Sequence, residues 1–279
     1  MNLEQKRKWI EIICENINMP LEATQKVVET LPQLVNFEDE IAAMNCREIS
    51  EESWKQLKKR LEPDQDGWKI LTAMLIASKK ACQTMQTKGD IQQQIWATMG
   101  VFSRFVKEHF SELGRYGFDR DFWTWRQLCG QIIRLGCFEY ETAIYDGKDW
   151  KEIHTGEPCI LIHIPSDSNM SHEQQEQSIA LARTKWKDLP FCCYSWLMAP
   201  ALDEFLPANS KLREFRSRFE VSQVDLENKD YIRWVFNNTQ APVEKWPEET
   251  TLQRNIKAHI INDGKIGAAW GYLKSNEAK

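Results

Sequence analysis

The side chains best suited to acid–base chemistry lie on short apolar segments near the middle of the chain. His163 follows the run CILI and shares a strand face with Cys159 and Leu161, because side chains alternate between the two faces of a strand. An imidazole titrates near neutral pH, so His163 can transfer a proton or contact a ligand. A hydrogen-bonded core histidine is the commoner explanation for such a residue, and both explanations remain open.

Two carboxylates precede this histidine on an alternating segment. Glu139 and Glu141 share the polar face of residues 138–144, where carboxylates are usually solvated. Either one could instead serve as a general base if burial raised its pKa toward neutrality. Both possibilities therefore stand for each residue.

A second apolar run, at residues 191–196, carries further reactive side chains. Tyr194 is a candidate catalytic residue there. Cys192 and Cys193 are expected to be inert, because a mid-strand thiol without a cationic environment stays protonated. The phenol is therefore the candidate from this run.

A strand–helix–strand pattern positions these side chains. Residues 159–164 form a β-branched run that Pro165 ends, since proline cannot donate to a sheet ladder. Ser171 opens a predicted helix that reaches about residue 187, and residues 191–196 form a second buried strand. This order predicts a parallel strand pair with a crossover helix, and ligand sites in such sheets lie beyond the strand ends.

The sequence before Gly136 has helical periodicity. Helices are predicted at residues 3–17, 20–31, 50–61, 68–85 and 90–113, and from Asp119 or Asp121 to Gly136. At Cys137 the period changes to that of a half-buried strand. The sequence therefore predicts a helical N-terminal domain at residues 1–136 and an α/β domain at residues 137–279.

The second domain is expected to be an α/β (α+β) fold with a mixed sheet flanked by helices. The Asp146-Gly147 turn signal predicts a hairpin partner at residues 150–154. The remaining elements are predicted as helices at 200–206, 210–218 and 250–261, strands at 219–222, 232–236 and 266–273, and a loop at 240–249. The sheet edge after residue 164 is thus the expected place for a site.

Composition limits the classes of function. The net charge of −5 argues against a general nucleic-acid surface, which needs a basic stripe. The eight cysteines have no zinc spacing, so no metal site is expected. Neither a signal core nor an apolar run of about 18 residues is present, which predicts a cytoplasmic protein with reduced thiols and no membrane contact.

The arginines of the C-terminal half could bind an anion. Arg213 and Arg216 are neighbours on a helix, whereas Arg218 faces elsewhere. Solvated or salt-bridged arginines are favoured over an anion site. Arg254 lies in the first turn of the helix at 250–261, where a cation opposes the helix dipole, and this slightly raises the odds that it serves a partner or a ligand.

A series of sequence segments, in a fixed order along the chain, resembles a known family. The strings ILIHIP, CCYSWLMAP, LPANSKLREFRSRF, RWVF and TTLQRNIKAHIINDGKIGAAWGYL resemble the GNAT-like C-terminal domain of a bacterial acyltransferase-domain family. Upstream, FWTWRQLCGQIIRLGCFEYE resembles the end of the helical N-terminal domain that accompanies it. The resemblance runs from about Asp66 to Leu273, and it is the order of the strings, not any single motif, that is specific.

This resemblance implies an acyltransferase that works by positioning two substrates. Acetyl-CoA or another acyl-CoA would place its pantetheine arm where the strands at 159–164 and 191–196 splay, and its pyrophosphate at residues 165–173. A carboxylate or histidine would take a proton from the acceptor amine. The residues implied are His163, Glu141, Glu139 and Tyr194 for catalysis and Ser166, Ser168, Asn169 and Ser171 for the cofactor, with Arg254 as a further candidate.

The chain departs from the family pattern at two places. Residues 166–171 contain no glycine, and Asp167 would repel a pyrophosphate that it faced. The family commonly has a histidine at the position of Tyr194 and an aspartate at that of Ala199. Both departures weaken the link between the fold and the family's chemistry.

Three functions follow. The first is an acyl-CoA-dependent acyltransferase that acts on a small-molecule or peptide amine. The second is a non-catalytic protein that binds a small ligand with a degenerate GNAT-like fold, which the glycine-free loop favours. The third, a protein whose helical half docks a partner, is weaker because helices with full apolar stripes usually bury them in their own core. The acceptor, the acyl group and the oligomeric state stay undefined at this level.

Overall fold

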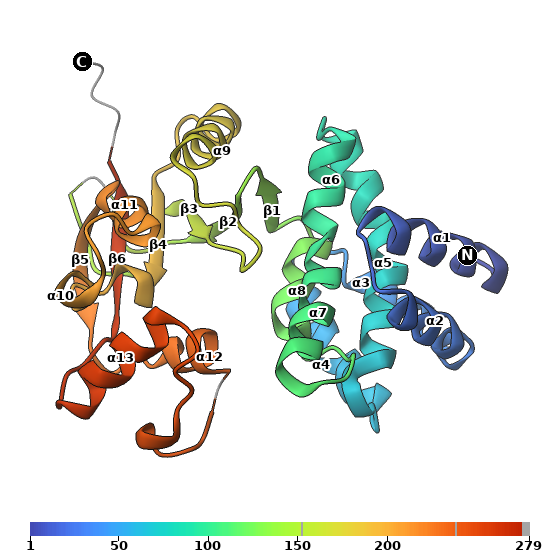
Figure 1. Ribbon diagram of the computed structural model, residues 1–279. Coiled ribbons are helices and arrows are strands. Elements are labelled where there is room, and N and C mark those ends of the chain that lie inside the picture. Colours follow the sequence, from blue (N-terminus) through green and yellow to red (C-terminus); the bar gives the residue numbers. More distant parts are fainter. Residues whose placement is uncertain (152, 238, 275–279) are drawn as a thin grey trace. The chain divides into compact units, whose positions relative to one another are not determined.

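A computed structural model describes residues 1–151, 153–237 and 239–274. The chain divides into two compact units, Met1–Glu139 and Tyr140–Lys279 (Figure 1). The family resemblance predicted a helical region followed by a mixed sheet flanked by helices, and this fold class is confirmed. No helix in the described ranges is both long and apolar enough to span a membrane.

The first unit is built around one long helix whose first half is largely buried. Its helices are α1 (Leu3–Asn16), α2 (Leu21–Thr30), α3 (Glu38–Ala43), α4 (Ser50–Leu61), α5 (Trp68–Thr87), α6 (Gln92–Met99), α7 (Val101–Leu113) and α8 (Asp121–Leu128). Every residue of α5 from Ile70 to Ser78 is buried, so this part of the helix has no solvent face and lies in the core, whereas the last turns expose Lys80, Gln83 and Thr84. The indole N–H of Trp9 on α1 donates to the Leu75 carbonyl at 2.9 Å, which fixes α1 against α5.

Two predicted helices in this unit are wrong in extent. The helix predicted at 90–113 is divided into α6 and α7 at Gly100, a residue with low helix propensity. The last helix ends at Leu128 instead of Gly136, because Gly130 adopts a left-handed conformation with φ of 72°. The following residues form β1 (Ile132–Leu135), so the first strand lies before Gly136.

A six-stranded mixed sheet is the framework of the second half. Its strands are β1, β2 (Phe138–Ile144), β3 (Pro158–His163), β4 (Phe191–Ser195), β5 (Phe219–Asp225) and β6 (Ala268–Leu273), in the order β1-β2-β3-β4-β6-β5. The predicted parallel pair is confirmed, because β3 pairs in parallel with β4 and α9 (His172–Lys185) connects them. Strand β6 pairs antiparallel with both β4 and β5.

The hairpin partner predicted at 150–154 is wrong. The neighbours of β2 in the sheet are β1 and β3, and the predicted segment forms only a tight bridge between Trp150 and Ile153. Tyr145 N–H instead donates to the Glu157 carbonyl at 2.8 Å, immediately before β3 begins.

The strand predicted at 232–236 is a helix. The short helices of this unit are α10 (Leu202–Phe205), α11 (Lys211–Ser217) and α12 (Asp230–Phe236), and α13 (Thr251–Ile261) follows the loop. Helix α12 buries Tyr231 and Phe236 against Trp246, with the Phe236 and Trp246 ring centroids 4.5 Å apart. This burial outweighs the strand preference of its aromatic and β-branched residues.

Candidate active site

One face of the sheet collects the polar residues singled out above. In register, Leu161 of β3 lies beside Cys192 of β4, and Tyr194 of β4 lies beside Trp270 of β6. Side chains two residues apart on a strand share a face, so His163 and Tyr194 lie on the same face. We call this the histidine face. It comprises Glu141, Ala143, Leu161, His163, Cys192, Tyr194, Trp270 and Tyr272.

The opposite face of the sheet is covered by α9. The hydroxyl of Tyr140 lies 2.9 Å from that of Ser178 on this helix, and both residues are buried. Helix α9 therefore leaves the histidine face to other elements.

His163 and Glu141 form a hydrogen-bonded pair across β3 and β2. The Nε2 atom of His163 lies 2.7 Å from Oε2 of Glu141. The carboxylate side chain is 6% exposed, whereas the imidazole is 21% exposed. An Nε2–H that donates to the carboxylate makes Nδ1 the basic nitrogen of the ring. A buried carboxylate behind a more accessible imidazole is the arrangement used to orient a general base.

Glu139, the neighbouring carboxylate, has a different environment. It is buried, and its Oε1 lies 2.8 Å from Nη2 of Arg104 on α7, which is also buried. The solvated-face interpretation is therefore wrong for Glu139 and for Glu141. Only Glu141 has a described contact with His163, and an ion pair is the described role of Glu139.

The phenol of Tyr194 is bound by the end of β5 and the loop after it. It donates to Oδ2 of Asp225 at 3.2 Å, and it accepts from Nδ2 of Asn228 at 3.4 Å. Partial burial, and then the hydrogen bond to Asp225, raise the pKa of Tyr194 above its usual range. At neutral pH this phenol is thus a neutral donor and not a base.

The parallel strands separate near His163. Their register covers Ile160–Phe191 and Leu161–Cys192, and β3 ends at His163. Strand β4 stays paired with β6 as far as Ser195–Ala269. The end of β4 therefore stays beside β6 and is no longer paired with β3. This separation of the two strand ends, next to His163, is the place where the resemblance implied a pantetheine arm.

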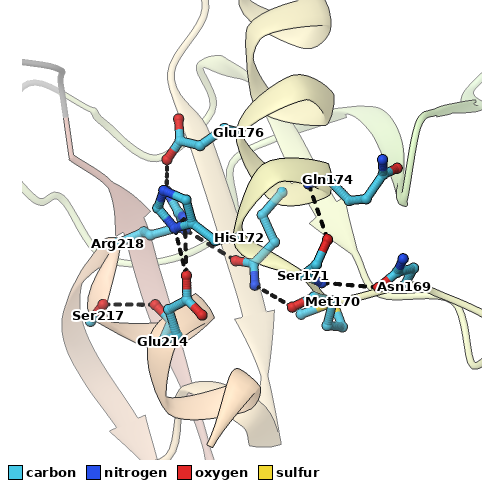
Figure 2. Close-up of polar contacts among 10 residues, drawn as sticks. Asn169, Met170, Ser171, His172, Gln174, Glu176, Glu214, Ser217 and Arg218 are labelled. Carbon is cyan, nitrogen blue, oxygen red and sulfur yellow. Dashed lines mark hydrogen bonds and ion pairs between the residues drawn. The ribbon is translucent and has the colours of Figure 1, made fainter. Parts of the chain in front are cut away.

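The loop after β3 satisfies many of its own polar groups. A turn at Ser166 is closed by Ser168 N–H donating to the Pro165 carbonyl at 3.0 Å. Asn169 Oδ1 accepts from Ser171 N–H at 3.1 Å, and Ser171 Oγ accepts from Gln174 N–H (Figure 2). Ser171 is confirmed as the helix cap. Three of the four predicted cofactor residues of this loop thus contribute to its own hydrogen bonds.

Arg218 is the residue at this loop that sequence reasoning missed. Figure 2 shows its guanidinium at the start of α9, where Nε donates to Gln175 Oε1 at 3.0 Å and Nη2 lies 3.0 Å from Nδ1 of His172. It also pairs with Glu176, and Glu214 lies 3.6 Å from Nη2. Two carboxylates therefore balance the one guanidinium. The sequence separation of more than 40 residues between Arg218 and α9 hid this cluster.

The other arginines do not reach the loop. Arg213 and Arg216 both pair with Asp203, so the salt-bridged interpretation is confirmed. Arg254 donates to the Glu248 carbonyl at 2.7 Å and to Thr251 Oγ1 at 3.0 Å. Figure 1 shows α13, which carries Arg254, at the opposite end of this unit from α9.

Two cysteines of the sheet, Cys192 and Cys193, are protonated thiols. Burial raises the pKa of Cys193 to about 12. The hydrogen bond with Cys159, followed by burial, raises the pKa of Cys192 even further. Thiols in this state are poor nucleophiles, which agrees with the prediction that they are inert. Within the described part of the chain, no group of three or more His, Cys, Asp or Glu side chains is arranged to hold a metal.

The connection between β2 and β3 crosses toward β5. We call residues 145–157 the strap. Lys148 N–H donates to Gln223 Oε1 of β5 at 2.7 Å, and Gln223 Nε2 donates to the hydroxyls of Tyr145 at 2.9 Å and Tyr272 at 3.0 Å. The indole of Trp150 stacks on Tyr272, with centroids 5.6 Å apart. The strap therefore adds aromatic side chains to the histidine face.

Comparison with known proteins gives matches to families and to solved structures. The comparison with curated proteins found no match. Crystal structures of acyltransferases match over most of the chain. One in complex with decanoyl-CoA and teicoplanin has a TM-score of 0.76 at 17% identity, covering 95% of this chain and 87% of that chain. One in complex with CoA and 10C-teicoplanin has a TM-score of 0.75 at 18% identity over the same shares. A third, with decanoyl-CoA, has a TM-score of 0.73 at 16% identity and covers 98% and 99%.

These structures share the fold of this chain. The family described as N-acyltransferase N-terminal domain matches residues 10–130. The family described as GNAT-like C-terminal domain matches residues 132–273, which include all six strands. The chain therefore belongs to the acyltransferase family that combines these two domains.

Proposed function

We propose that this protein transfers an acyl group from an acyl-CoA thioester to an amine of a small molecule or peptide. The observation that carries the proposal is the 2.7 Å hydrogen bond between His163 and the buried carboxylate of Glu141. The pair lies where β3 ends and where β4 is paired with β6 but no longer with β3. A base is needed there, because an amine must lose a proton as its nitrogen forms the new amide bond.

The roles of the pair follow from its geometry. Glu141 holds the imidazole with the proton on Nε2, so Nδ1 accepts the proton of the attacking amine. As the carbon–nitrogen bond forms and the carbon–sulfur bond breaks, the buried carboxylate stabilises the imidazolium that results. The departing thiolate takes up a proton, so one proton leaves the amine and one joins the thiol. Neutral Tyr194 remains a candidate proton donor for the thiolate.

We propose acyl-CoA as the donor, with an acyl chain longer than acetyl. Solved acyltransferases of this fold hold decanoyl-CoA and octanoyl-CoA. In this chain the strand ends beside His163 fit a pantetheine arm, and the α9 start with Ser166, Ser168, Asn169 and Ser171 is the proposed pyrophosphate end. Arg218 is the cation nearest that end, whereas Arg254 lies on a distant helix. We also propose a cytoplasmic location in a bacterium; the eight free cysteine thiols support only the cytoplasmic part of this proposal.

The second candidate is a non-catalytic protein that binds a small ligand. The self-bonded loop at 166–171 and the carboxylates around Arg218 favour it, because both reduce the attraction for a pyrophosphate. The two candidates therefore make different predictions about products, and only the acyltransferase requires CoA binding.

Binding and turnover, measured separately, decide between them. Isothermal titration with CoA, acetyl-CoA and decanoyl-CoA measures binding, and mass spectrometry of an amine library incubated with decanoyl-CoA measures transfer. The acyltransferase predicts CoA-ester binding and an acylated amine. Binding without any acylated product supports the non-catalytic protein, and no CoA binding at millimolar concentration contradicts the acyltransferase and favours a protein that binds another small ligand.

A further inference from the structure

The strap carries a buried polar group that the proposed chemistry does not use. The indole Nε1–H of Trp150 is buried and has no hydrogen-bond partner among the described residues. A buried donor without an acceptor is costly and rare in folded proteins. The same ring stacks on Tyr272, and Lys151 beside it pairs with Glu220 of β5. The strap is thus held in place while this donor stays unused.

The Trp150 ring, which carries this donor, lies over the histidine face at the end away from the loop to α9. Leu161, Cys192 and Tyr272 lie side by side on β3, β4 and β6. Tyr272 is therefore level with Leu161, two residues before His163, and lies two strands away from β3. The standard rise per residue and strand spacing give a distance of about 12 Å between the backbone positions of Tyr272 and His163. The loop to α9 begins at the other end of β3, immediately after His163. A ligand with phosphates at α9 and its thioester at His163 continues toward Trp150.

The surface between these two points is apolar. Leu161, Ala143, Tyr272 and Trp150 are all partly exposed on it, and Cys192 lies buried beneath. An extended acyl chain of medium length spans this distance and matches this surface. Its far end then lies beside the unused indole donor.

We propose that this protein prefers acyl groups with a hydrogen-bond acceptor, such as a hydroxyl, at the end distant from the thioester, and that Trp150 recognises this acceptor. The inference rests on the proposed function, since it takes the thioester position from His163. It makes Trp150 a specificity-determining residue that contacts the substrate without taking part in proton transfer. An unsubstituted chain would leave the indole donor unsatisfied.

The test compares two CoA esters on two variants. Isothermal titration with decanoyl-CoA and ω-hydroxydecanoyl-CoA is made on the natural protein, on Trp150→Phe, which keeps an aromatic ring but lacks the donor, and on Trp234→Phe. Trp234, 41% exposed on α12, is the matched control. We expect the natural protein and the control to bind the hydroxy ester roughly 2- to 12-fold more tightly, the range of one net hydrogen bond. Trp150→Phe should lose this preference and keep its affinity for decanoyl-CoA.

A second readout does not depend on the stability of the variant. In protein labelled with ¹⁵N at its indoles, the Trp150 N–H resonance should shift more with the hydroxy ester than with decanoyl-CoA. Equal affinity of the natural protein for both esters, or an equal loss of both in Trp150→Phe, would overturn the inference while CoA binding remains intact. If free CoA also fails to bind, the proposed function itself has failed.

Discussion

At the scale of single residues, His163 and Glu141 depend on each other in a way that Glu139 does not share. The two carboxylates lie on the same face of β2 and are both buried, yet one is bound to an imidazole and the other to a guanidinium. The two carboxylates therefore have different roles: Glu141 orients a base, and Glu139 stabilises the fold.

The first prediction separates these two roles. Glu141→Gln keeps the size of the side chain but removes the charge that stabilises the imidazolium, so turnover should fall by about 10²-fold or more with little change in melting temperature. Glu139→Gln is the matched control and should act on stability, because it removes the closer, buried anion of Arg104 and leaves Glu108 at 3.8 Å, at a cost of up to about 3–5 kcal/mol. Turnover and thermal melting of both variants are the measurements. Similar losses of turnover per folded molecule would contradict the division of roles.

Tyr194 gives the second prediction. Its raised pKa keeps the phenol protonated throughout the neutral range, so activity should not show a transition from its ionisation below pH 10. Tyr194→Phe removes the hydrogen bond to Asp225 and should destabilise the protein by about 1 kcal/mol. The pH–rate profiles of the natural protein and the variant should have the same shape. A limb below pH 10 that disappears in Tyr194→Phe would contradict the prediction, because it would show that the phenol ionises in the range where we expect it to stay neutral.

Residue-level reasoning from the sequence reached part of this site. The position of His163 on its strand face could be predicted, because it follows from the alternation of residues 159–163. Its partner could not be chosen, because the choice between Glu139 and Glu141 depends on the register of β2 against β3. Arg218 was missed for a similar reason, since a helix start and a strand start far apart in the sequence meet only in three dimensions.

At the scale of elements, local signals predicted the βαβ unit and failed where long-range packing decides. The parallel strands and the Ser171 cap were correct because proline, capping residues and β-branched runs act locally. Helix α12 was wrongly predicted as a strand, because its burial against Trp246 depends on a loop that follows it. The strap was wrongly predicted as a hairpin strand, because its partner on β5 lies more than 70 residues away.

The strap supplies the third prediction. Gln223 holds it through three hydrogen bonds, two with Lys148 and one with Tyr145, and makes a fourth with Tyr272 of β6, so Gln223→Ala should release the strap. Limited trypsin digestion of the native protein should then cut faster after Lys148 or Lys151. Gln177→Ala, on the exposed surface of α9, is the matched control and should leave the rate unchanged. Equal cleavage in all three proteins would show that Gln223 does not restrain the strap.

At the scale of the whole molecule, the order of the two domains was predicted from the order of the sequence segments that resemble the family. The family matches at residues 10–130 and 132–273 confirm that order, and the solved acyltransferases extend the same fold over nearly the whole chain. The ligand could be predicted only as a class, because the departures at 166–171 concern the loop that would hold it.

The fourth prediction concerns ligand binding to the intact chain. Decanoyl-CoA at roughly 100 times its dissociation constant should stabilise the folded protein by about 2.7 kcal/mol. For a protein of this length we expect a rise in melting temperature of roughly 5–10 °C. Differential scanning calorimetry with decanoyl-CoA, and with decanoic acid as the control that lacks the CoA group, is the measurement. An unchanged melting temperature with the ester, or an equal rise with the acid, would argue against a CoA site.

The central claim is that His163 is the base, and one variant tests it most directly. His163→Gln retains a polar side chain but cannot accept a proton at neutral pH, so turnover of decanoyl-CoA with an amine that the natural protein acylates should fall by about 10²–10⁴-fold. The affinity for decanoyl-CoA and the melting temperature, measured on the same sample, should stay close to those of the natural protein. A stable His163→Gln protein that retains turnover within a few-fold would contradict the account.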